Sequence, residues 1–556
     1  MQQTKKSDQI VLIFLAALTG INLLQSHLTE LIFDEAYYWY FAKDLAWGYF
    51  DHPPAVAFFV KLGSLLFDGE LGVRFFAPWL LSGSIYFIWK LIESPKKHEH
   101  VLLFCLISSS LALLNAYGFF MLPDTPLIFF STLFLFAYQG FLKKERVQNI
   151  FLLALSMALI MYSKYHAFLL IVFVILGNIR ILLNLNFWKA IGLSLLFYTP
   201  HLVWLFENDF APLRYHFFDR ADSYYKISYT TEYLLGLIGI MGFASPWIYY
   251  SLVKTHSQNK FDKSLKYTVW GIIIFFLFSS FNRRTQAQWP MLIIIPLFIF
   301  VFRYAINHPK FKKGLTVASS VSLVVICYLR FAMLFPSLIP FSYETHGNKA
   351  WAMELKEKTN GLPVIFTNSY RNASMYSFYS GVDAYSLNDL KFRLNQYDLD
   401  TSELRFQNKK VAYITNSEAY SPSFSVQQAF KNRTLKGIIV ANFSSWRKLK
   451  IETETQNIKS FSQPQPITII NPYNVNIPIE KLELHGVTLD EKKRIIDTLK
   501  IKVNDYDAPI IKANSFMNLK ISILDHTPEN IEKYFRLSIS ENELPYGFNG
   551  EIIPIK

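Results

Sequence analysis

Residues 10–25, IVLIFLAALTGINLLQ, form an apolar run that follows Lys5 and Lys6 near the start of the chain. A basic start and an apolar run also characterise signal peptides, but no small-x-small cleavage site follows this one. About ten similar runs come later in the chain, so we expect the first to be a retained signal anchor. A membrane-spanning helix takes about 20 apolar residues, and the sequence therefore predicts an α-helical polytopic membrane protein.

The composition agrees with this fold class. Hydrophobic residues make up 52% of the 556 residues and charged residues only 17%, which is too apolar for a soluble enzyme of this size. Hydropathy predicts about eleven spans. They cover residues 10–25, 71–92, 101–117, 125–142, 149–163, 166–183, 187–206, 232–253, 267–281, 290–306 and 315–335.

The placement of Lys and Arg predicts the orientation of the spans. With the N-terminus in the cytoplasm, the basic short connections fall on that side, as the positive-inside rule requires. The cytoplasmic segments are then 1–9, 93–100, 143–148, 184–186, 254–266 and 307–314, and the outer ones are 26–70, 118–124, 164–165, 207–231, 282–289 and everything after Phe335. The net charge of +13 follows this topological pattern, so we predict no nucleic-acid partner.

The chain changes character after Phe335. Residues 1–340 form the predicted membrane domain, and the rest is polar enough to fold in water. Residues 341–445 alternate strand-like runs with polar helical stretches, which predicts a small α/β domain. Residues 446–556 are predicted to be β-rich, with one helix at about 489–500. The expected strands include Val364–Phe366, Val411–Ile414, Ile438–Val440, Ile467–Ile470 and Leu519–Leu524.

Three acidic residues lie in the outer segments close to aromatic or proline residues. Asp34 and Glu35 stand in IFDEAYYW, residues 32–39, and adjacent carboxylates at a membrane surface are costly unless paired, hydrated or metal-bound. Asp124 stands in LPDTP, just before the fourth predicted span. All three would also suit the first turn of a helix, so a capping role stays open.

A rigid corner follows the acid pair at residues 48–54, GYFDHPP. Its two prolines favour an extended backbone and contribute no backbone donors, so they would present Asp51 and His52 in a set direction. A turn that ends a helix explains the prolines equally well.

Several basic residues lie on the outer side, against the topological bias. They are Lys164, Arg214, Arg220, Lys226, Arg283 and Arg284. Lys164 stands in a connection of only two or three residues between two short spans. Snorkelling towards lipid headgroups explains any one of these cations, but the set predicts a fixed anion such as a phosphate or pyrophosphate. Gln286, Gln288 and Trp289 adjoin the arginine pair and offer hydrogen bonds and a stacking face.

Acids, cations and aromatic residues on one face describe a site for a substrate with a phosphate, hydroxyls and an apolar tail. Sugar transfer from a polyprenyl phosphate fits, because it passes through an oxocarbenium-like state and releases a phosphate that cations or a metal stabilise. Two other classes stay open. A flippase or transporter for lipid-linked sugars would place charges at mid-depth in its spans, and a non-catalytic assembly protein would leave the acid pair and the outer cations unexplained.

Residues 30–300 resemble the GT-C glycosyltransferases that use polyprenyl-phosphate sugars, which include the aminoarabinose transferases of lipid A and the protein O-mannosyltransferases. The matching motifs, in order, are Asp34-Glu35, YFDHPP at 49–54, ELGVR at 70–74, PDTP at 123–126, SKY at 163–165 and QWP at 288–290. Each motif alone is weak, but several in the same order and on one face are specific.

The resemblance implies a role for each candidate residue. Asp34 would be the catalytic carboxylate, as general base or metal ligand, with Glu35 and Asp124 assisting. His52 stands where the aminoarabinose transferases have a lysine, and it would bind the carrier phosphate or, with Asp34 and Glu35, a divalent metal. The other phosphate-binding candidates are Lys164, Arg214, Arg220, Arg283 and Arg284, and the other substrate-binding candidates are Tyr37, Tyr49, Gln288 and Trp289.

The resemblance also implies a reaction and a location. The donor would be a polyprenyl-phosphate hexose or pentose, the acceptor lipid A, a glycan or a protein, and the product would have inverted configuration. A hydroxyl acceptor must lose its proton, which would make Asp34 the general base, whereas a phosphate acceptor would leave it to hold a metal or orient the sugar. The protein would lie in the cell inner membrane with a periplasmic C-terminal region.

Overall fold

The computed structural model describes residues 2–216, 225–415, 421–453, 464–523 and 531–555. The chain divides into two compact units, of which the first comprises residues 1–348 and 429–431 and the second residues 349–428 and 432–556.

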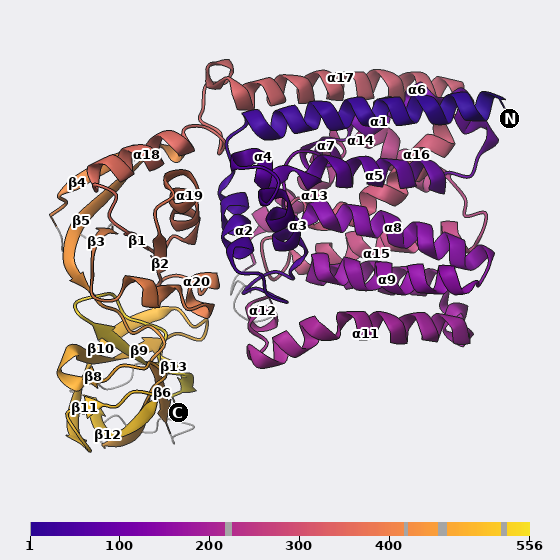
Figure 1. Cartoon of the computed structure of the whole chain (residues 1–556). Helices are drawn as coiled ribbons and strands as arrows, with labels where there is room; N and C mark the ends of the chain where they lie inside the picture. The colour runs from indigo at the N-terminus through magenta and orange to yellow at the C-terminus, as the bar shows by residue number, and fades with distance from the viewer. Residues whose placement is uncertain (1, 217–224, 416–420, 454–463, 524–530, 556) are drawn as a thin grey trace. The chain divides into compact units, whose positions relative to one another are not determined.

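The first unit is α-helical (Figure 1). Its longer helices are α1 (Gln2–Leu28), α5 (Phe76–Leu91), α8 (Asp124–Lys143), α9 (Val147–Ser163), α11 (Leu185–Glu207), α15 (Lys260–Ser279) and α17 (Pro309–Leu334). The shorter ones are α2 (Phe33–Lys43), α3 (Ala55–Ser64), α4 (Gly69–Arg74), α6 (Val101–Ser110), α7 (Ala112–Ala116), α10 (Phe168–Gly177), α12 (Ala211–Arg214), α13 (Ile227–Gly239), α14 (Ser245–Lys254) and α16 (Ile294–Ala305).

Each of the eleven apolar runs contains a helix or an interrupted helix. By length and composition, the described residues hold five helices able to cross a membrane, namely α1, α4–α5, α8, α11 and α17. A sixth would be the pair α13–α14, which is bent by 97°. The runs at 101–117, 149–163, 166–183 and 290–306 contain shorter apolar helices. The structure therefore confirms a polytopic helical protein, while the number of eleven spans stays a prediction.

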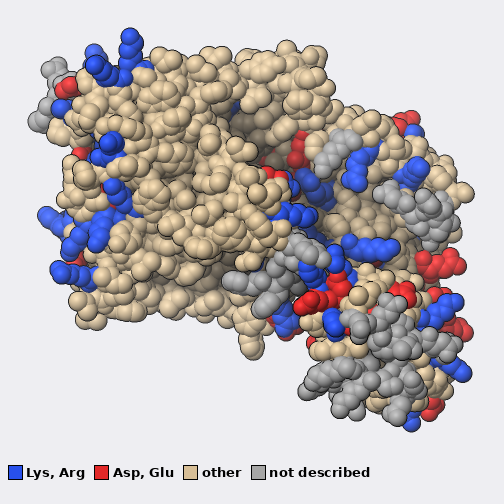
Figure 2. All heavy atoms as spheres, turned by 180° about the vertical axis from the view of Figure 1, so that it is seen from behind, with Lys and Arg blue, Asp and Glu red and all other residues tan. Residues whose placement is uncertain are grey.

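The connections expected in the cytoplasm meet at one end of the unit. Hydrogen bonds and ion pairs join four sequence-distant pairs of them, which are Ser7–His98, Lys96–Asn307, Lys143–Glu93 and Asn184–Glu145. Arg303 in the last turn of α16 pairs with Asp262 of a further connection. Figure 2 shows the wall of the helical unit as a surface poor in charge, with Lys and Arg side chains gathered at one end. These contacts show that the connections expected in the cytoplasm lie together at one end, while the side of the membrane on which they lie stays a prediction.

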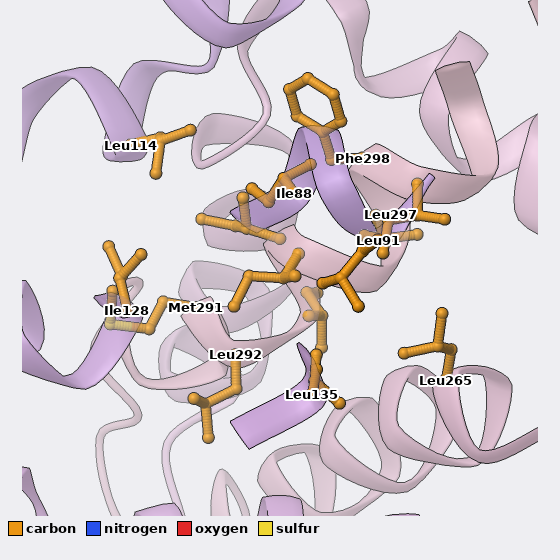
Figure 3. Packing of buried hydrophobic residues seen from close by; sticks show 14 of the residues in the cluster. Ile88, Leu91, Leu114, Ile128, Leu135, Leu265, Met291, Leu292, Leu297 and Phe298 are labelled. Atoms are coloured by element: carbon orange, nitrogen blue, oxygen red, sulfur yellow. The ribbon is translucent and has the colours of Figure 1, made fainter. Parts of the chain in front are cut away.

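The interior of the helical unit is a single apolar core. The helix α16 is buried on every side from Ile294 to Phe302, as expected of a helix that is hydrophobic all round. Its Phe298 lies edge-on to Phe104 of α6, with ring centroids 5.2 Å apart. Figure 3 shows Phe298 and Leu297 among leucine and isoleucine side chains of the neighbouring helices. This core holds the helix ends that carry the polar site.

The second unit contains two main sheets. The first has the order β2-β1-β3-β5-β4, with β2, β1 and β3 parallel, and the second has the antiparallel order β14-β13-β9-β10-β12-β7-β6. The first-sheet strands are β1 (Val364–Thr367), β2 (Ala384–Leu387), β3 (Lys409–Ile414), β4 (Phe424–Gln428) and β5 (Arg433–Phe443), with helices α18 (Asn348–Lys358), α19 (Tyr370–Ser380) and α20 (Gln396–Leu399). The strands of the second sheet are β6 (Lys450–Thr453), β7 (Gln465–Asn471), β9 (Leu482–Leu489), β10 (Ile495–Tyr506), β12 (Ser515–Ile523), β13 (Tyr534–Glu541) and β14 (Ile552–Pro554). The short strands β8 (Ile477–Pro478) and β11 (Ile510–Ile511) pair with each other.

The prediction of a helix at about 489–500 is wrong. The chain turns at Asp490 and continues as β10, which pairs with β9 on one side and β12 on the other. The Glu, Lys and Leu residues of this stretch favour a helix in isolation, but pairing between two strands outweighs that preference.

A network of buried carboxylates joins the two sheets within the second unit. Glu403 accepts hydrogen bonds from the hydroxyl groups of Tyr473 and Ser445, at 2.6 and 2.8 Å. Glu541 of β13 accepts one from the backbone N–H of Trp446 at 3.0 Å and lies 3.2 Å from Arg447. Burial raises the pKa of Glu541 to about 7, against the opposing effect of Arg447.

Candidate active site

The acid pair opens helix α2 at the end of the helical unit opposite the basic connections. Ile32 before the helix is extended, and its backbone N–H donates to the Glu35 carboxylate at 3.2 Å. Asp34 and Glu35 both lie in the first helical turn, where the helix dipole favours negative charge. Asp34 is partly exposed, whereas Glu35 is fully buried. The two neighbours therefore face different surroundings.

Glu35 is bound on both of its oxygens. Arg74 donates through Nε to Oε1 at 2.7 Å and through Nη2 to Oε2 at 2.5 Å, and both side chains are 0% exposed. The backbone N–H of Met121 donates to Oε1 at 2.9 Å. Arg74 also donates to the carbonyl groups of Ser26, Thr29 and Glu30. These contacts make Glu35 a positioning residue that links α2 to the segments around it, and they leave it poorly suited to hold a metal.

Arg74 reaches this place because two helices pack with almost no space between them. A Cβ atom on Gly72 of α4 would lie 2.0 Å from the carbonyl oxygen of Phe67, and one on Gly63 of α3 would lie 2.1 Å from the carbonyl oxygen of Gly72. Only glycine fits at such an approach. The ELGVR motif therefore works as a unit, with Gly72 permitting the packing that carries Arg74 to Glu35.

Asp124 and Lys164 form a second ion pair, with Lys164 Nζ 2.6 Å from Asp124 Oδ1. Asp124 is the first residue of α8 and Lys164 directly follows α9, so the dipole of each helix stabilises the charge at that end. The side chains are only 5% and 11% exposed. Tyr117 lies beside Asp124, and Asp34 is also within its electrostatic range. This pair brings an acid and a cation of the same site together.

The proline corner presents His52 to a group of aromatic rings. The His52 ring lies 5.4 Å from the ring of Tyr38 and 6.3 Å from that of His216. His216 Nε2 donates to the carbonyl oxygen of Asp51 at 2.9 Å, and its ring lies 5.8 Å from that of Tyr165. The corner is therefore held by residues from three separate outer segments.

These contacts close a circuit around one location. Asp34 and Tyr38 lie one helical turn apart on α2, on the same face. From Tyr38 the contacts run through His52 and His216 to Tyr165, which directly follows Lys164. Lys164 pairs with Asp124, and Tyr117 lies between Asp124 and Asp34 in electrostatic range of both. We call this set of residues, Asp34, Tyr38, His52, Tyr117, Asp124, Lys164, Tyr165 and His216, the polar ring.

The arginines expected at the phosphate differ in their positions. Arg283 is half-buried and donates through Nη1 to the carbonyl oxygen of His216 at 2.6 Å, which places it against the polar ring. Arg284 is 68% exposed and pairs with Glu232, and Arg214 is exposed at the end of α12. Arg220 lies outside the described residues. Of the expected arginines that the structure describes, Arg283 is the one with a hydrogen bond to a residue of the polar ring.

The substrate-binding candidates are mostly packing residues. Tyr37 is buried beside Phe41, and Tyr49 stacks on the same ring at 4.3 Å. The hydroxyl of Tyr49 donates to the carbonyl oxygen of Asp44, and burial raises its pKa to about 12. Trp289 is buried and donates to Gln286, to which Gln288 also donates. These contacts indicate that Tyr37, Tyr49 and Trp289 are buried packing residues that support the site without lining it.

A metal site is not assembled by these side chains. Among the described residues, no group of three or more His, Cys, Asp and Glu side chains lies close enough to hold a metal ion. Because Glu35 is engaged by Arg74, only Asp34 and His52 are left of the three proposed ligands. Metal dependence therefore stays a prediction.

The sequence did not single out three residues of the ring, Tyr38, Tyr117 and His216. Tyr117 stands at the end of an apolar run without any polar motif, and His216 lies in a long outer segment whose path is set by tertiary contacts. Arg74 belonged to a recognised motif, but nothing in the sequence showed that it pairs with Glu35. A conserved pattern across relatives is the signal that would find such residues.

An apolar helical unit with an acid and cation site at one end has the architecture of a polytopic membrane enzyme. The family model for dolichyl-phosphate-mannose-protein mannosyltransferases matches residues 51–204, a range that includes the His52 corner, Asp124 and Lys164. The lipid A galacturonosyltransferase RgtD of Rhizobium johnstonii is 21% identical over 341 residues, which are 57% of this chain and 69% of that protein.

Solved structures show the same fold. ArnT from Cupriavidus metallidurans in the apo state aligns with a TM-score of 0.57 and 11% identity, covering 78% of this chain and 98% of that one. The same protein bound to undecaprenyl phosphate aligns with a TM-score of 0.56 and 11% identity, over 77% and 98% of the two chains. The chain therefore shares the fold of these glycosyltransferases, and the family model and the sequence relative that it resembles are also of glycosyltransferases.

Proposed function

We propose that the protein transfers a monosaccharide from a polyprenyl-phosphate carrier to lipid A or a related lipid-linked glycan. Support comes from the family match, from a relative named for transfer to lipid A, and from a structural neighbour solved with undecaprenyl phosphate. The observation that carries the proposal is the polar ring, in which the Asp124–Lys164 ion pair lies next to Tyr117 and near Asp34.

The ring supplies both charges that such a transfer needs. The carrier phosphate is an anion, and Lys164, Arg283 and the two imidazoles of His52 and His216 are the groups that can bind it. Charge-assisted hydrogen bonds to a phosphate are roughly twice as strong as neutral ones. The phosphate gains negative charge as it leaves, so the same cations stabilise the transition state more than the ground state.

Asp34 acts on the other reactant. When the acceptor is a hydroxyl group, Asp34 takes its proton as the oxygen attacks the anomeric carbon. The bond from that carbon to the carrier phosphate breaks on the opposite face, which inverts the configuration. The products are the glycosylated acceptor and the polyprenyl phosphate. When the acceptor is a phosphate, it has no proton to lose at neutral pH, and Asp34 orients the sugar instead.

We further propose that the ring lies at the periplasmic face of the inner membrane. The basic connections gather at the opposite end, and the positive-inside rule assigns that end to the cytoplasm. A flippase for lipid-linked sugars is less well supported, because the charges of the polar ring stand at helix ends rather than at mid-depth. The donor sugar is proposed to be a hexose or a pentose.

The test is transfer from a labelled undecaprenyl-phosphate sugar to lipid A in membranes that contain wild type or Asp34→Asn. Removing a general base costs about 10²- to 10⁴-fold in rate, so we expect at least a 100-fold loss at unchanged protein level. Glu232→Gln is the matched control, because Glu232 is an exposed carboxylate in an outer segment that pairs with the exposed Arg284. Transfer retained by Asp34→Asn would contradict the role of Asp34.

Metal dependence is a separate proposal with its own test. Asp34 and His52 are the side chains left to hold a divalent ion beside the carrier phosphate. Loss of transfer on adding a chelator, with recovery on returning magnesium or manganese, would support it. Undiminished transfer in the chelator would exclude it without affecting the role of the ring.

A further inference from the structure

The lipid-facing side of α17 carries a groove that the transfer site does not use. Helix α14 beside it has 10 residues, and at about 1.5 Å per residue it covers about half of a hydrocarbon core about 30 Å thick. The preceding helix α13 lies at 97° to α14. Gly242 stands at this break with a φ of 65°, a conformation that glycine adopts without strain. Helix α14 therefore accompanies α17 through only one half of the membrane.

The groove lies between α17 and the start of α14 and has a volume of about 490 Å³. Its lining residues are Phe243, Trp247, Lys310, Lys313, Gly314, Val317, Ala318 and Val321. On α17 these follow a spacing of three or four residues, so they lie on one helical face. Gly314 keeps the groove open to the indole of Trp247, because a Cβ atom there would lie 2.6 Å from its Nε1.

The two ends of the groove differ in polarity. Lys310 and Lys313 stand in the first two turns of α17, at the end of the unit where the basic connections gather, whereas Val317 and Val321 continue towards the middle of the membrane. Both lysines are exposed, and no hydrogen bond or ion pair to another described residue engages either side chain. Positive charge at a helix N-terminus opposes the helix dipole. An anion bound here would therefore be stabilised by both lysines and by the dipole.

We propose that this groove binds an anionic phospholipid of the leaflet on the lysine side. Its phosphate lies between Lys310 and Lys313, and one acyl chain runs along Val317 and Val321 against Phe243 and Trp247. From Lys310 to Val321 the helix rises about 16 Å, which matches one leaflet of the hydrocarbon core. A soluble anion would leave the apolar part of the groove uncovered, and a zwitterionic lipid would not neutralise the lysines.

Native mass spectrometry of the full chain in detergent, with added phosphatidylglycerol or phosphatidylcholine, tests this proposal. We expect wild type to retain phosphatidylglycerol at least tenfold more than phosphatidylcholine. The variant K310Q/K313Q is expected to lose this preference. Lys312→Gln is the matched control, because Lys312 stands in the same helical turn but outside the groove lining.

A second variant tests the apolar part. Val321→Trp fills the groove from an exposed position, so it is expected to lower phosphatidylglycerol retention while the protein stays folded. Equal retention of the two lipids by wild type would overturn the proposal. So would an equal loss in Lys312→Gln and in K310Q/K313Q, or displacement of the lipid by glycerol phosphate alone, since the latter indicates a soluble anion.

Discussion

Lys164 and Asp124 form a nearly buried ion pair, 2.6 Å between Nζ and Oδ1, at the neighbouring ends of α9 and α8. The pair keeps a cation in place at low exposure before any substrate arrives. In the proposed reaction, the carrier phosphate would share the ammonium group of Lys164 with Asp124, which continues to orient it.

A double-mutant cycle separates the structural and functional roles of this pair. Removing one partner of a buried pair costs about 3–5 kcal/mol, so we expect both Lys164→Gln and Asp124→Asn to be destabilised. The double variant D124N/K164Q is expected to recover most of this stability, because no buried charge is left unpaired. Thermal unfolding in detergent measures the first effect. Donor binding is expected to stay weak in the double variant, and recovery of binding would show that Lys164 has no role at the phosphate.

The two neighbouring arginines provide a matched comparison. Arg283→Gln is expected to weaken binding of the polyprenyl-phosphate sugar by about 10- to 100-fold, since a hydrogen bond to a charged group contributes about 1.5–3 kcal/mol. Arg284→Gln is expected to leave binding unchanged, because Arg284 is exposed and pairs with Glu232. Titration with a fluorescent donor analogue measures both. An equal effect of the two substitutions would assign the loss to surface charge in general.

Arg74 is expected to contribute to the stability of the folded protein and not to the chemical step. Arg74→Lys keeps the charge but loses the bidentate geometry and the three carbonyl contacts, so we expect a destabilisation of several kcal/mol. The folded fraction of the variant is expected to transfer sugar at close to the normal rate per molecule, provided that Asp34 keeps its place. A wild-type melting temperature for this variant would contradict the anchoring role of the Glu35–Arg74 pair.

The second unit is expected to lose stability as the pH rises through neutrality. Burial raises the pKa of Glu541 to about 7, above its value in an unfolded chain of about 4.3. The protonated form is therefore favoured in the folded state, and this contribution is complete below about pH 4 and lost as the pH passes 7. Arg447 and Glu403 are the charged neighbours that act on it.

Hydrogen exchange in β13 of the full-length protein, corrected for intrinsic rates, measures this effect between about pH 6 and pH 8.5. We expect lower protection at the higher pH in wild type and a flatter response in Glu541→Gln. The same pH response in both proteins would remove Glu541 as its cause.

The sequence predicted the parts of the molecule that depend on local pattern. The apolar runs and the charged connections were enough to place helices and to sort their ends, because both follow from the bilayer alone. The strands at Val364–Phe366 and Ile467–Ile470 were equally visible from their composition. The strand after Asp490 could not be predicted in the same way, because it depends on pairing with β9 and β12 and not on local composition.

The site was predictable in its residue types and less so in its pairings. The acids and cations of the ring were identified by their position on the outer side, apart from His216. The pairing of Glu35 with Arg74 depends on the close approach of Gly63 and Gly72, which a sequence does not show. The exposure of Arg284 beside the half-buried Arg283 likewise depends on tertiary structure alone.

The most direct test of the transfer site is photocrosslinking with an undecaprenyl phosphate that carries a diazirine next to the phosphate. The polar ring predicts that the label appears on peptides that contain residues 51–54 or 163–167, and that unlabelled carrier competes for it. Label confined to residues 93–100 or 307–314, at the basic end of the helical unit, would contradict the account.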